Sequence, residues 1–128
     1  MGGLRELREL HAMNNRLTSL PASLGTLAEL RRLDLQDNQL ASLPHSLGGL
    51  SHLTDLNLRN NHLTSLPDSV SGLSRLRFLD LRANRGIQLP AGLEDLRELE
   101  KLDLRWAKLT ALPPWVDQLK RRGCVVYT

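Results

Sequence analysis

Residues 53–75 read LTDLNLRNNHLTSLPDSVSGLSR, and the spacing of apolar residues in this stretch decides the fold of the chain. Leu56 and Leu58 alternate with polar residues, which is the pattern of a β-strand with one buried face. A turn-forming asparagine follows at Asn61, and Pro67 then begins a segment with apolar residues three apart, which suits one or two turns of helix. The stretch therefore predicts a strand, a turn and a helical return.

The same pattern recurs with a fixed period of 23 residues, which is the sequence signature of a repeat architecture. Two columns keep this step, namely Asn15, Asn38, Asn61 and Asn84, and Pro21, Pro44, Pro67, Pro90 and Pro113. Five units follow, at residues 7–29, 30–52, 53–75, 76–98 and 99–121, with a partial unit at 1–6 and a terminal strand at 122–128. We expect the 128 residues to form a single domain.

A single unit cannot enclose its own leucines, so the units must stack and merge them into one core. Stacking lays the strands side by side in a parallel sheet, about 4.8 Å apart, whereas the helical segments behind them need more room. The stack must therefore curve, with the sheet on its inner side. The sequence thus predicts an α/β solenoid with a parallel β-sheet on the concave face and short helices or 3-10 turns on the convex face.

Each unit reads close to LxxLxLxxNxLxxLPxxLxxLxx, and this consensus resembles the leucine-rich-repeat family, in particular its 23-residue LPxxL class of bacterial and intracellular Ras-group proteins. The resemblance covers nearly the whole chain. It implies a right-handed horseshoe in which the repeated asparagine points inward and hydrogen-bonds to backbone groups. It also implies a non-catalytic scaffold, used in relatives for signalling assembly, host-target recognition by bacterial effectors and regulation of small GTPases.

Two departures from the consensus lie in the carboxyl-terminal half. Ala107 stands where the asparagine is expected, and losing such a buried partner costs about 1–3 kcal/mol unless water or a rearranged turn replaces it. In the fourth unit Gly86 takes the place of a leucine and Ile87 follows it. This shift predicts an irregular loop.

Both ends of the chain depart from a regular repeat, although stacked repeats normally need a polar cap at each end. Residues 1–4 fall in register with residues 47–50, so no amino-terminal cap is visible, which indicates a longer array, a neighbouring domain or self-association. At the other end the β-prone residues 124–127 predict a closing strand. The repeat register points Val125 and Tyr127 inward, while the irregular turn before them leaves the opposite face, Cys124 and Val126, open as the buried one.

Composition argues against several classes of function. The 17 basic and 14 acidic residues alternate along the chain, so we expect no unbroken basic track for nucleic acid. The four histidines occupy different repeat positions and predict no metal site. The lone cysteine has no histidine near it in the sequence, and phosphate-binding loops are absent, so we expect neither enzyme activity nor a cofactor.

The sequence also bears on location. No apolar run approaches the roughly 18 residues that span a bilayer, and the first residues lack the hydrophobic region of a signal peptide. A single cysteine forms no internal disulfide. We therefore expect a cytoplasmic protein without membrane contact, and export as an effector stays open.

Side chains that flank the strand leucines point outward and form columns across the concave sheet. One column reads His11, Asp34, Asn57, Asp80 and Asp103, and the next reads Met13, Gln36, Arg59, Arg82 and Arg105. The outer columns read Glu9, Arg32, Asp55, Phe78 and Lys101, and Asn14, Asp37, Asn60, Ala83 and Trp106. An acidic stripe therefore lies beside a basic one, with two aromatic rings in the carboxyl-terminal half.

These columns predict a partner-binding patch, because aromatic and arginine anchors dominate the binding energy of interfaces. Its predicted members are Arg59, Phe78, Asp80, Arg82, Asp103, Arg105 and Trp106. Two alternatives stand beside it: the charged stripes neutralise each other, and Trp106 fills the space left by the missing asparagine at position 107. The leading hypothesis is recognition of a protein or peptide through the concave surface. The other hypothesis is an architectural spacer in a longer repeat protein, such as the repeat portion of a bacterial effector.

Overall fold

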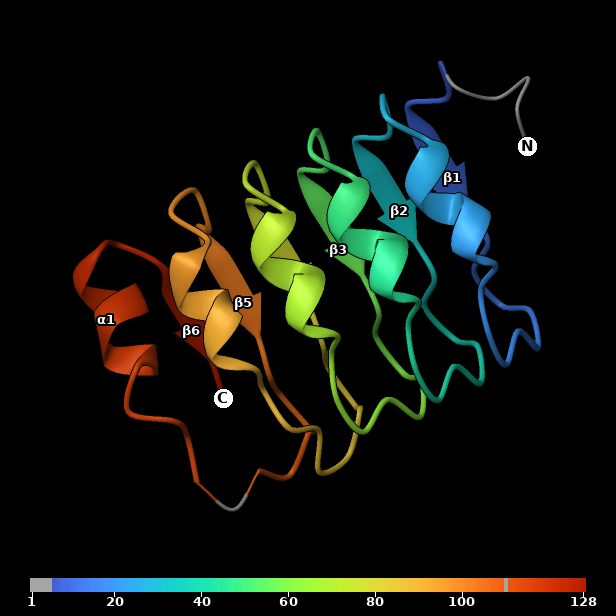
Figure 1. Ribbon diagram of the computed structural model, residues 1–128. Helices are drawn as coiled ribbons and strands as arrows, with labels where there is room; N and C mark the ends of the chain where they lie inside the picture. The colour runs from blue at the N-terminus through green and yellow to red at the C-terminus, as the bar shows by residue number, and fades with distance from the viewer. Residues whose placement is uncertain (1–5, 110) are drawn as a thin grey trace.

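The computed structural model describes residues 6–109 and 111–128, so the predicted partial unit at 1–6 lies outside it except for Glu6 (Figure 1). Six strands form one parallel sheet in chain order: β1 (Glu9–His11), β2 (Arg32–Asp34), β3 (Asp55–Asn57), β4 (Phe78–Asp80), β5 (Lys101–Asp103) and β6 (Val125–Tyr127). From β1 to β5 each strand pairs with the next at a step of 23 residues, as in Leu33 opposite Leu56. The leucine period of the sequence is therefore the register of the sheet.

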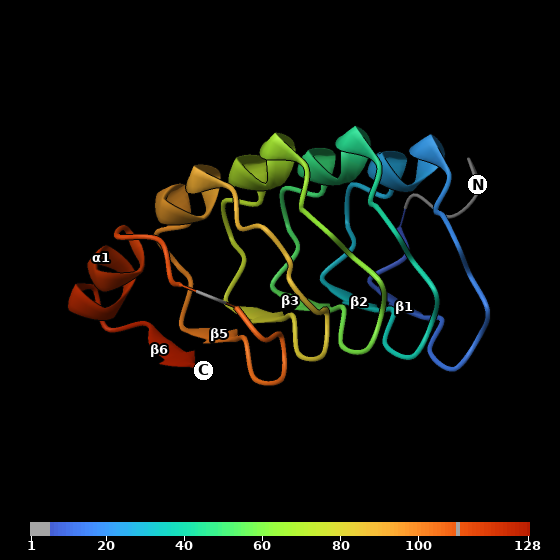
Figure 2. The same ribbon diagram turned by 90° about the horizontal axis from the view of Figure 1, so that it is seen from below.

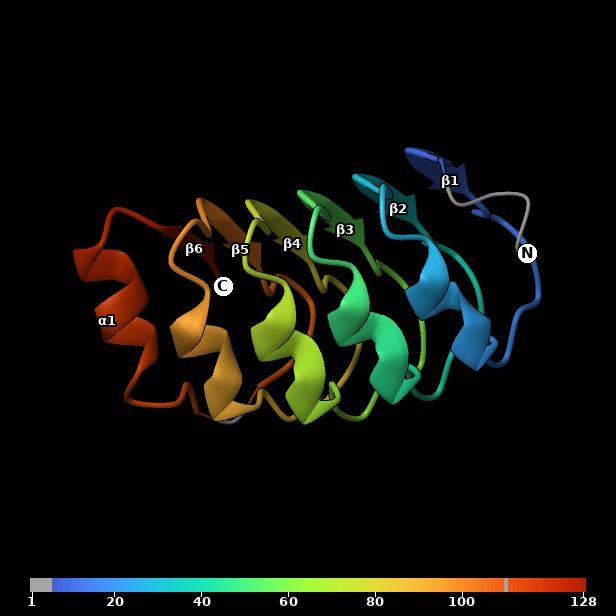
Figure 3. The same cartoon turned by 45° about the horizontal axis from the view of Figure 1, so that its top comes forward.

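Each strand returns through a short helix on the other side of the core. The helices are the 3-10 helices η2 (Ala22–Thr26), η3 (His45–Gly49), η4 (Asp68–Gly72) and η5 (Ala91–Asp95), followed by the α-helix α1 (Val116–Arg121). A proline precedes each 3-10 helix, and its carbonyl accepts a backbone hydrogen bond from three residues ahead at 3.0–3.1 Å. Figure 2 shows these helices on the outer side of a gentle curve and the strands on the inner side, and Figure 3 shows the same two layers obliquely. The predicted solenoid is confirmed.

Leucine fills the space between the two layers. Strand leucines such as Leu58 and Leu81 and helix-side leucines such as Leu50 are completely buried. In the first described repeat, by contrast, Leu10 and Leu17 are only half-buried. A repeat thus gains its core from the repeats on both of its sides, as one-dimensional stacking requires.

The outer layer packs closely because glycines face the neighbouring helix. A Cβ atom on Gly48 of η3 would overlap the carbonyl oxygen of Ser69 in η4 and lie 2.8 Å from the Ser69 Cβ. A Cβ on Gly25 would overlap the Ser46 carbonyl oxygen in the same way. The close contact between successive 3-10 helices therefore depends on glycine, which has no Cβ atom, at these positions.

Buried asparagines connect successive turns. Asn61 donates from Nδ2 to the carbonyls of Leu58, in its own repeat, and Leu35, in the preceding one, at 3.1 and 3.0 Å. Its Oδ1 accepts the backbone N–H of Leu40 at 3.1 Å. Asn38 and Asn84 make the same pattern of contacts. The inward asparagine that the resemblance implied is therefore confirmed at these three positions.

A rearranged turn replaces the asparagine that is missing at position 107. One repeat earlier, the backbone N–H of Leu63 donates to the side chain of Asn84. Gly86 is the residue equivalent to Leu63, and Ala107, which is equivalent to Asn84, has no side-chain acceptor for the Gly86 N–H. Gly86 instead donates to the backbone carbonyl of Ala107 at 2.7 Å. Its φ of +70° allows this, and Ile87 takes the core position with 2% of its surface exposed. The predicted irregular loop is present. It provides a hydrogen-bond acceptor for the Gly86 N–H, which would otherwise have none because position 107 is an alanine.

Gly86→Ala tests this compensation. We expect it to lower the free energy of unfolding by about 1 kcal/mol, because a Cβ disfavours a left-handed backbone. The Cβ would meet no atom within 4 Å beyond its chain neighbours, so the backbone is the only source of the loss. Urea unfolding measures it. Gly86→Asn, which tolerates this conformation, is the matched control, and equal losses in the two variants would contradict the explanation.

The register predicted for the terminal strand is wrong. Cys124 is 5% exposed and Val126 packs against the core, whereas Val125 and Tyr127 are 47% and 37% exposed. The α1 helix and the left-handed Gly123 after it add one residue relative to the repeat, so that Val125, and not Cys124, pairs with Lys101. Because side chains alternate along a strand, a shift of one residue exchanges the two faces. The alternative, with Cys124 and Val126 inward, is confirmed.

Candidate partner-binding surface

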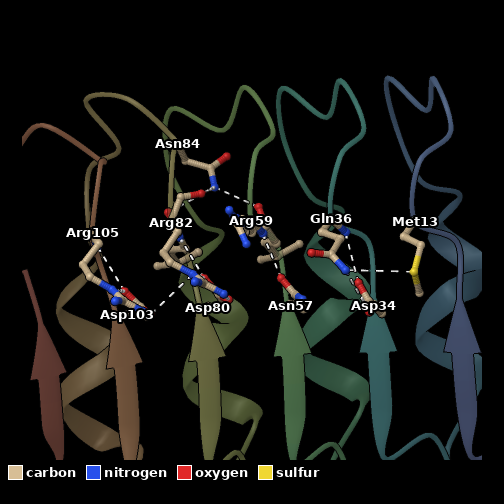
Figure 4. A network of polar contacts seen from close by, with 12 residues as sticks. Met13, Asp34, Gln36, Asn57, Arg59, Asp80, Arg82, Asn84, Asp103 and Arg105 are labelled. Atoms are coloured by element: carbon tan, nitrogen blue, oxygen red, sulfur yellow. Dashed lines mark hydrogen bonds and ion pairs between the residues drawn. The ribbon is translucent and has the colours of Figure 1, made fainter.

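The inner face of the sheet carries two bidentate ion pairs at the carboxyl ends of the strands (Figure 4). Arg82 donates to Asp80 from Nε at 2.9 Å and from Nη2 at 2.6 Å. Arg105 donates to Asp103 in the same way, at 3.0 and 2.7 Å. The Arg82 Nε also lies 3.4 Å from the Asp103 carboxylate, which links the two repeats. The basic and acidic stripes therefore neutralise each other in these two repeats.

The acidic column also shapes the backbone. The Oδ1 atom of each member from β2 to β5 accepts the backbone N–H two residues ahead at 3.1–3.2 Å. Asn57 does this as well as Asp34, Asp80 and Asp103 do. The turn therefore requires an oxygen at this position and does not require a negative charge.

The ion pairs shift the ionisation of their members. Burial disfavours the charged form of Asp103, but hydrogen bonds from the Arg105 side chain and backbone outweigh it and lower the pKa of Asp103. The hydrogen bond to Asp80 raises the pKa of Arg82. Both shifts favour the charged forms of Asp103 and Arg82.

Acid should weaken the fold partly through Asp103. Because its pKa is lower in the folded chain than the ordinary value of 3.8, its ionised form stabilises the fold above that value. That contribution is lost as the pH falls from about 4 through the lowered pKa. Thermal unfolding between about pH 7 and pH 3 should show a shallower loss in Asp103→Asn than in the wild type. An unchanged slope in Asp103→Asn would refute the assignment.

Trp106 stands exposed above the arginine column. It is the most exposed large apolar residue of the described chain, at 56%, and three guanidinium carbons lie 5.5 Å (Arg59), 6.0 Å (Arg82) and 5.7 Å (Arg105) from the ring centroid. These distances fall within the range of cation–π attraction. The alternative in which Trp106 fills the space beside Ala107 is therefore wrong.

The backbone of Trp106 is left-handed, with φ of +61°. The same conformation recurs at every equivalent position, namely Asn14, Asp37, Asn60 and Ala83, with φ of 56–59°. Asparagine and aspartate tolerate it, whereas a bulky side chain pays about 1–2 kcal/mol. The fold thus holds a tryptophan in a strained and exposed position.

A groove of about 350 Å³ crosses the sheet from His11 on β1 to Tyr127 on β6. Phe78 lies in it half-buried, with the Arg77 guanidinium carbon at 5.2 Å and the Lys101 ammonium at 5.7 Å from its ring. Tyr127 lies in it beside Arg105, whose guanidinium carbon is 5.2 Å from the ring. Tyr127 was not among the predicted patch residues, because the repeat register had turned it inward.

The seven predicted patch residues share one face but form two parts. Phe78, Asp80 and Asp103 line the groove. The second part lies at the carboxyl ends of the strands, where three arginines surround the indole ring of Trp106, namely Arg59, Arg82 and Arg105. The Asp–Arg pairs join the two parts.

Metal-binding and membrane-spanning features are absent from residues 6–109 and 111–128. No three histidine, cysteine, aspartate or glutamate side chains lie together there as a metal ion would require. No helix in those segments is both long and apolar enough to cross a membrane. Burial raises the pKa of the Cys124 thiol, which reduces the thiolate form that acts as a nucleophile.

Comparison with known proteins gives relatives for the fold. A family profile described as leucine rich repeat matches residues 5–63, 29–85 and 51–109. The Leptospira interrogans LRR protein LIC12759 is 36% identical with a TM-score of 0.92, over 98% of this chain and 32% of that one. No curated protein matches.

Two plant receptor ectodomains are also similar. That of the receptor kinase SOBIR1 from Arabidopsis thaliana is 28% identical with a TM-score of 0.72, over 92% of this chain and 66% of that one. That of the Arabidopsis receptor kinase HAESA, in complex with an IDA peptide hormone ligand, is 32% identical with a TM-score of 0.73, over 92% and 20%. The chain thus spans 32% of the Leptospira protein and 20% of the HAESA ectodomain. With the profile matched across most of its length and the repeat register present in the sheet, the chain belongs to the leucine-rich repeat family.

Proposed function

We propose that this chain is a protein-interaction module that recognises a protein or peptide segment through the concave face of its sheet. Trp106 carries the proposal. A strained backbone persists where the surrounding structure enforces it, and such strain clusters at functional positions. Here the left-handed turn holds a large ring outside the core, with arginine side chains beside it, which favours a role in binding.

The surroundings of the ring suit a binding anchor. Exposed tryptophan and arginine are the side chains that most often dominate an interface. Arg82 and Arg105 are held in fixed orientation by their aspartates, so they lose little side-chain entropy on contact with a partner. The groove beside them offers length for an extended segment. The peptide bound by the similar HAESA ectodomain supports a peptide as the partner class.

Trp106→Asn separates binding from folding. Asn14 and Asn60 occupy the same repeat position with φ of 58° and 56°, so asparagine fits without strain. We expect the variant to unfold with a free energy equal to or up to about 1 kcal/mol above that of the wild type. We expect it to lose roughly tenfold to thirtyfold in affinity for peptides that the wild type selects from a displayed random library.

Two measurements complete the test. Arg97→Ala, which changes an exposed arginine in the turn after η5, is the control and should keep full affinity. If the wild type selects no peptide, or if Trp106→Asn binds the selected peptides as well as the wild type, the proposed site is wrong. The architectural role, in which the chain spaces or stabilises neighbouring parts of a longer repeat protein, would then be the remaining proposal.

A further inference from the structure

The Asp–Arg pair of the inner face occurs in the repeats of β4 and β5; at β2 an aspartate stands before a glutamine, and at β3 an arginine stands without its aspartate. Arg82 and Arg105 each bind the aspartate two residues before them. At the end of β3 the equivalent residues are Asn57 and Arg59, and the Arg59 side chain forms no ion pair with any described residue within 4.0 Å (Figure 4). Arg59 is therefore the member of the arginine column that lacks a carboxylate.

The substitution at Asn57 leaves the local fold intact. Its Oδ1 accepts the Arg59 N–H at 3.1 Å, which is the distance at which Asp80 accepts the Arg82 N–H. Asn57 thus accepts the same backbone hydrogen bond as the aspartates of this column but carries no negative charge. What changes is that the Arg59 side chain has no carboxylate from the described part of the chain beside it. Arg59 is half-buried, and its guanidinium carbon lies 5.5 Å from the centre of the Trp106 ring.

We propose that Arg59 receives a carboxylate from the partner, so that an acidic side chain of a bound peptide completes the third Asp–Arg pair across the interface. This inference rests on the proposed function and specifies its partner as an acidic segment. A guanidinium binds a carboxylate through two parallel hydrogen bonds, and the two intact pairs show that this face of the sheet accommodates that geometry. The indole ring beside Arg59 packs the apolar part of the same segment.

Charge complementarity supports an acidic occupant over a basic one. Arg59, Arg82 and Arg105 form one row around Trp106, and only two of the three are neutralised by an aspartate two residues away. A basic segment would add repulsion at Arg59. A carboxylate placed beside Arg59 gains a local attraction there.

Asn57→Asp is the decisive variant, because it supplies the missing carboxylate from within the chain. We expect it to pair with Arg59 as Asp80 pairs with Arg82, and to exclude the partner's carboxylate. The probes are fluorescent peptides that the wild type selects from a displayed random library. We expect these peptides to share an aspartate or glutamate, and Asn57→Asp and Arg59→Gln each to weaken their binding about tenfold or more.

Two controls define the effect. Asn14→Asp adds the same charge in the column of left-handed residues, two repeats away from Asn57, where Asp37 shows that aspartate fits; it should change affinity less than about twofold. Replacing the acidic residue of the peptide by its amide should abolish the difference between the wild type and Asn57→Asp. Thermal unfolding should show that Asn57→Asp is at least as stable as the wild type.

The outcomes separate this inference from the proposed function. If the selected peptides lose affinity for Trp106→Asn but bind Asn57→Asp and Arg59→Gln as they bind the wild type, the concave face binds peptides and the Arg59 assignment is wrong. Selected peptides without acidic residues would overturn the Arg59 assignment in the same way. If the wild type selects no peptide, both proposals fail.

Discussion

Asn61→Ala is expected to lower the free energy of unfolding by about 3–5 kcal/mol, because several buried groups lose their partner at once. The side chain serves the carbonyls of Leu35 and Leu58 and the N–H of Leu40, which belong to two repeats. Each buried group left without a hydrogen bond costs about 1–3 kcal/mol. Denaturant unfolding followed by circular dichroism measures the loss.

The chain contains a matched control for this effect. Asn15 holds the same repeat position at the amino end, but it is exposed, and among residues 6–109 and 111–128 its side chain reaches only the carbonyls of Ala12 and Met13. We expect Asn15→Ala to cost less than about 1 kcal/mol. Asn61 has no substitute like the Gly86 turn that accommodates Ala107, because Leu40 stands where the glycine would be needed. Similar losses in the two variants would show that the contribution of the asparagine to the free energy of unfolding does not depend on its burial.

Gly48→Val is expected to destabilise the chain by about 3 kcal/mol, at the upper end of the usual cost of overpacking. Even the first added atom overlaps the carbonyl oxygen of Ser69, and that oxygen belongs to the backbone, so the whole of η4 must move away from η3. Chemical denaturation gives the loss. Small-angle scattering should also show a change in curvature, since the spacing of the outer helices has increased.

Gly49→Val provides the comparison in the same helix. The nearest atom to its Cβ position is the Gly25 carbonyl oxygen at 3.1 Å, so a shift of a few tenths of an ångström relieves the contact. We expect a clearly smaller loss of stability than in Gly48→Val. A larger loss at Gly49 would mean that the close approach of the helices does not limit the packing of the outer layer.

The fold could be predicted from the sequence because most repeats carry the same residue types at the same positions. Leu56 and Leu58 must be buried, Asn61 hydrogen-bonds to buried backbone groups of the turn, and Pro67 begins the helical segment. Because this pattern recurs every 23 residues, the strands pair in register at the same step. The register failed at the terminal strand, where α1 and Gly123 replace the 3-10 return and nothing in the repeat consensus fixes the length of the turn.

The patch was harder to predict than the fold. The sequence placed Trp106 in the correct column, but the choice between packing and exposure depended on a backbone conformation that the residue type does not reveal. The signal lies in the column itself: Asn14, Asp37 and Asn60 are residue types that tolerate a left-handed backbone. Tyr127 was missed for a different reason, since its exposure follows from the shifted register of β6.

The interruption of the charged column at Asn57 has a consequence for how a partner finds its alignment. On a perfectly periodic surface, an extended ligand displaced by one strand, about 4.8 Å, meets the same groups again, and several alignments have similar energies. Asn57, Phe78 and Trp106 are each a residue type that occurs only once in its column. The proposed partner would therefore have one alignment in which the unpaired arginine and the two rings all find a counterpart, and the irregular columns would prevent it from sliding along the array.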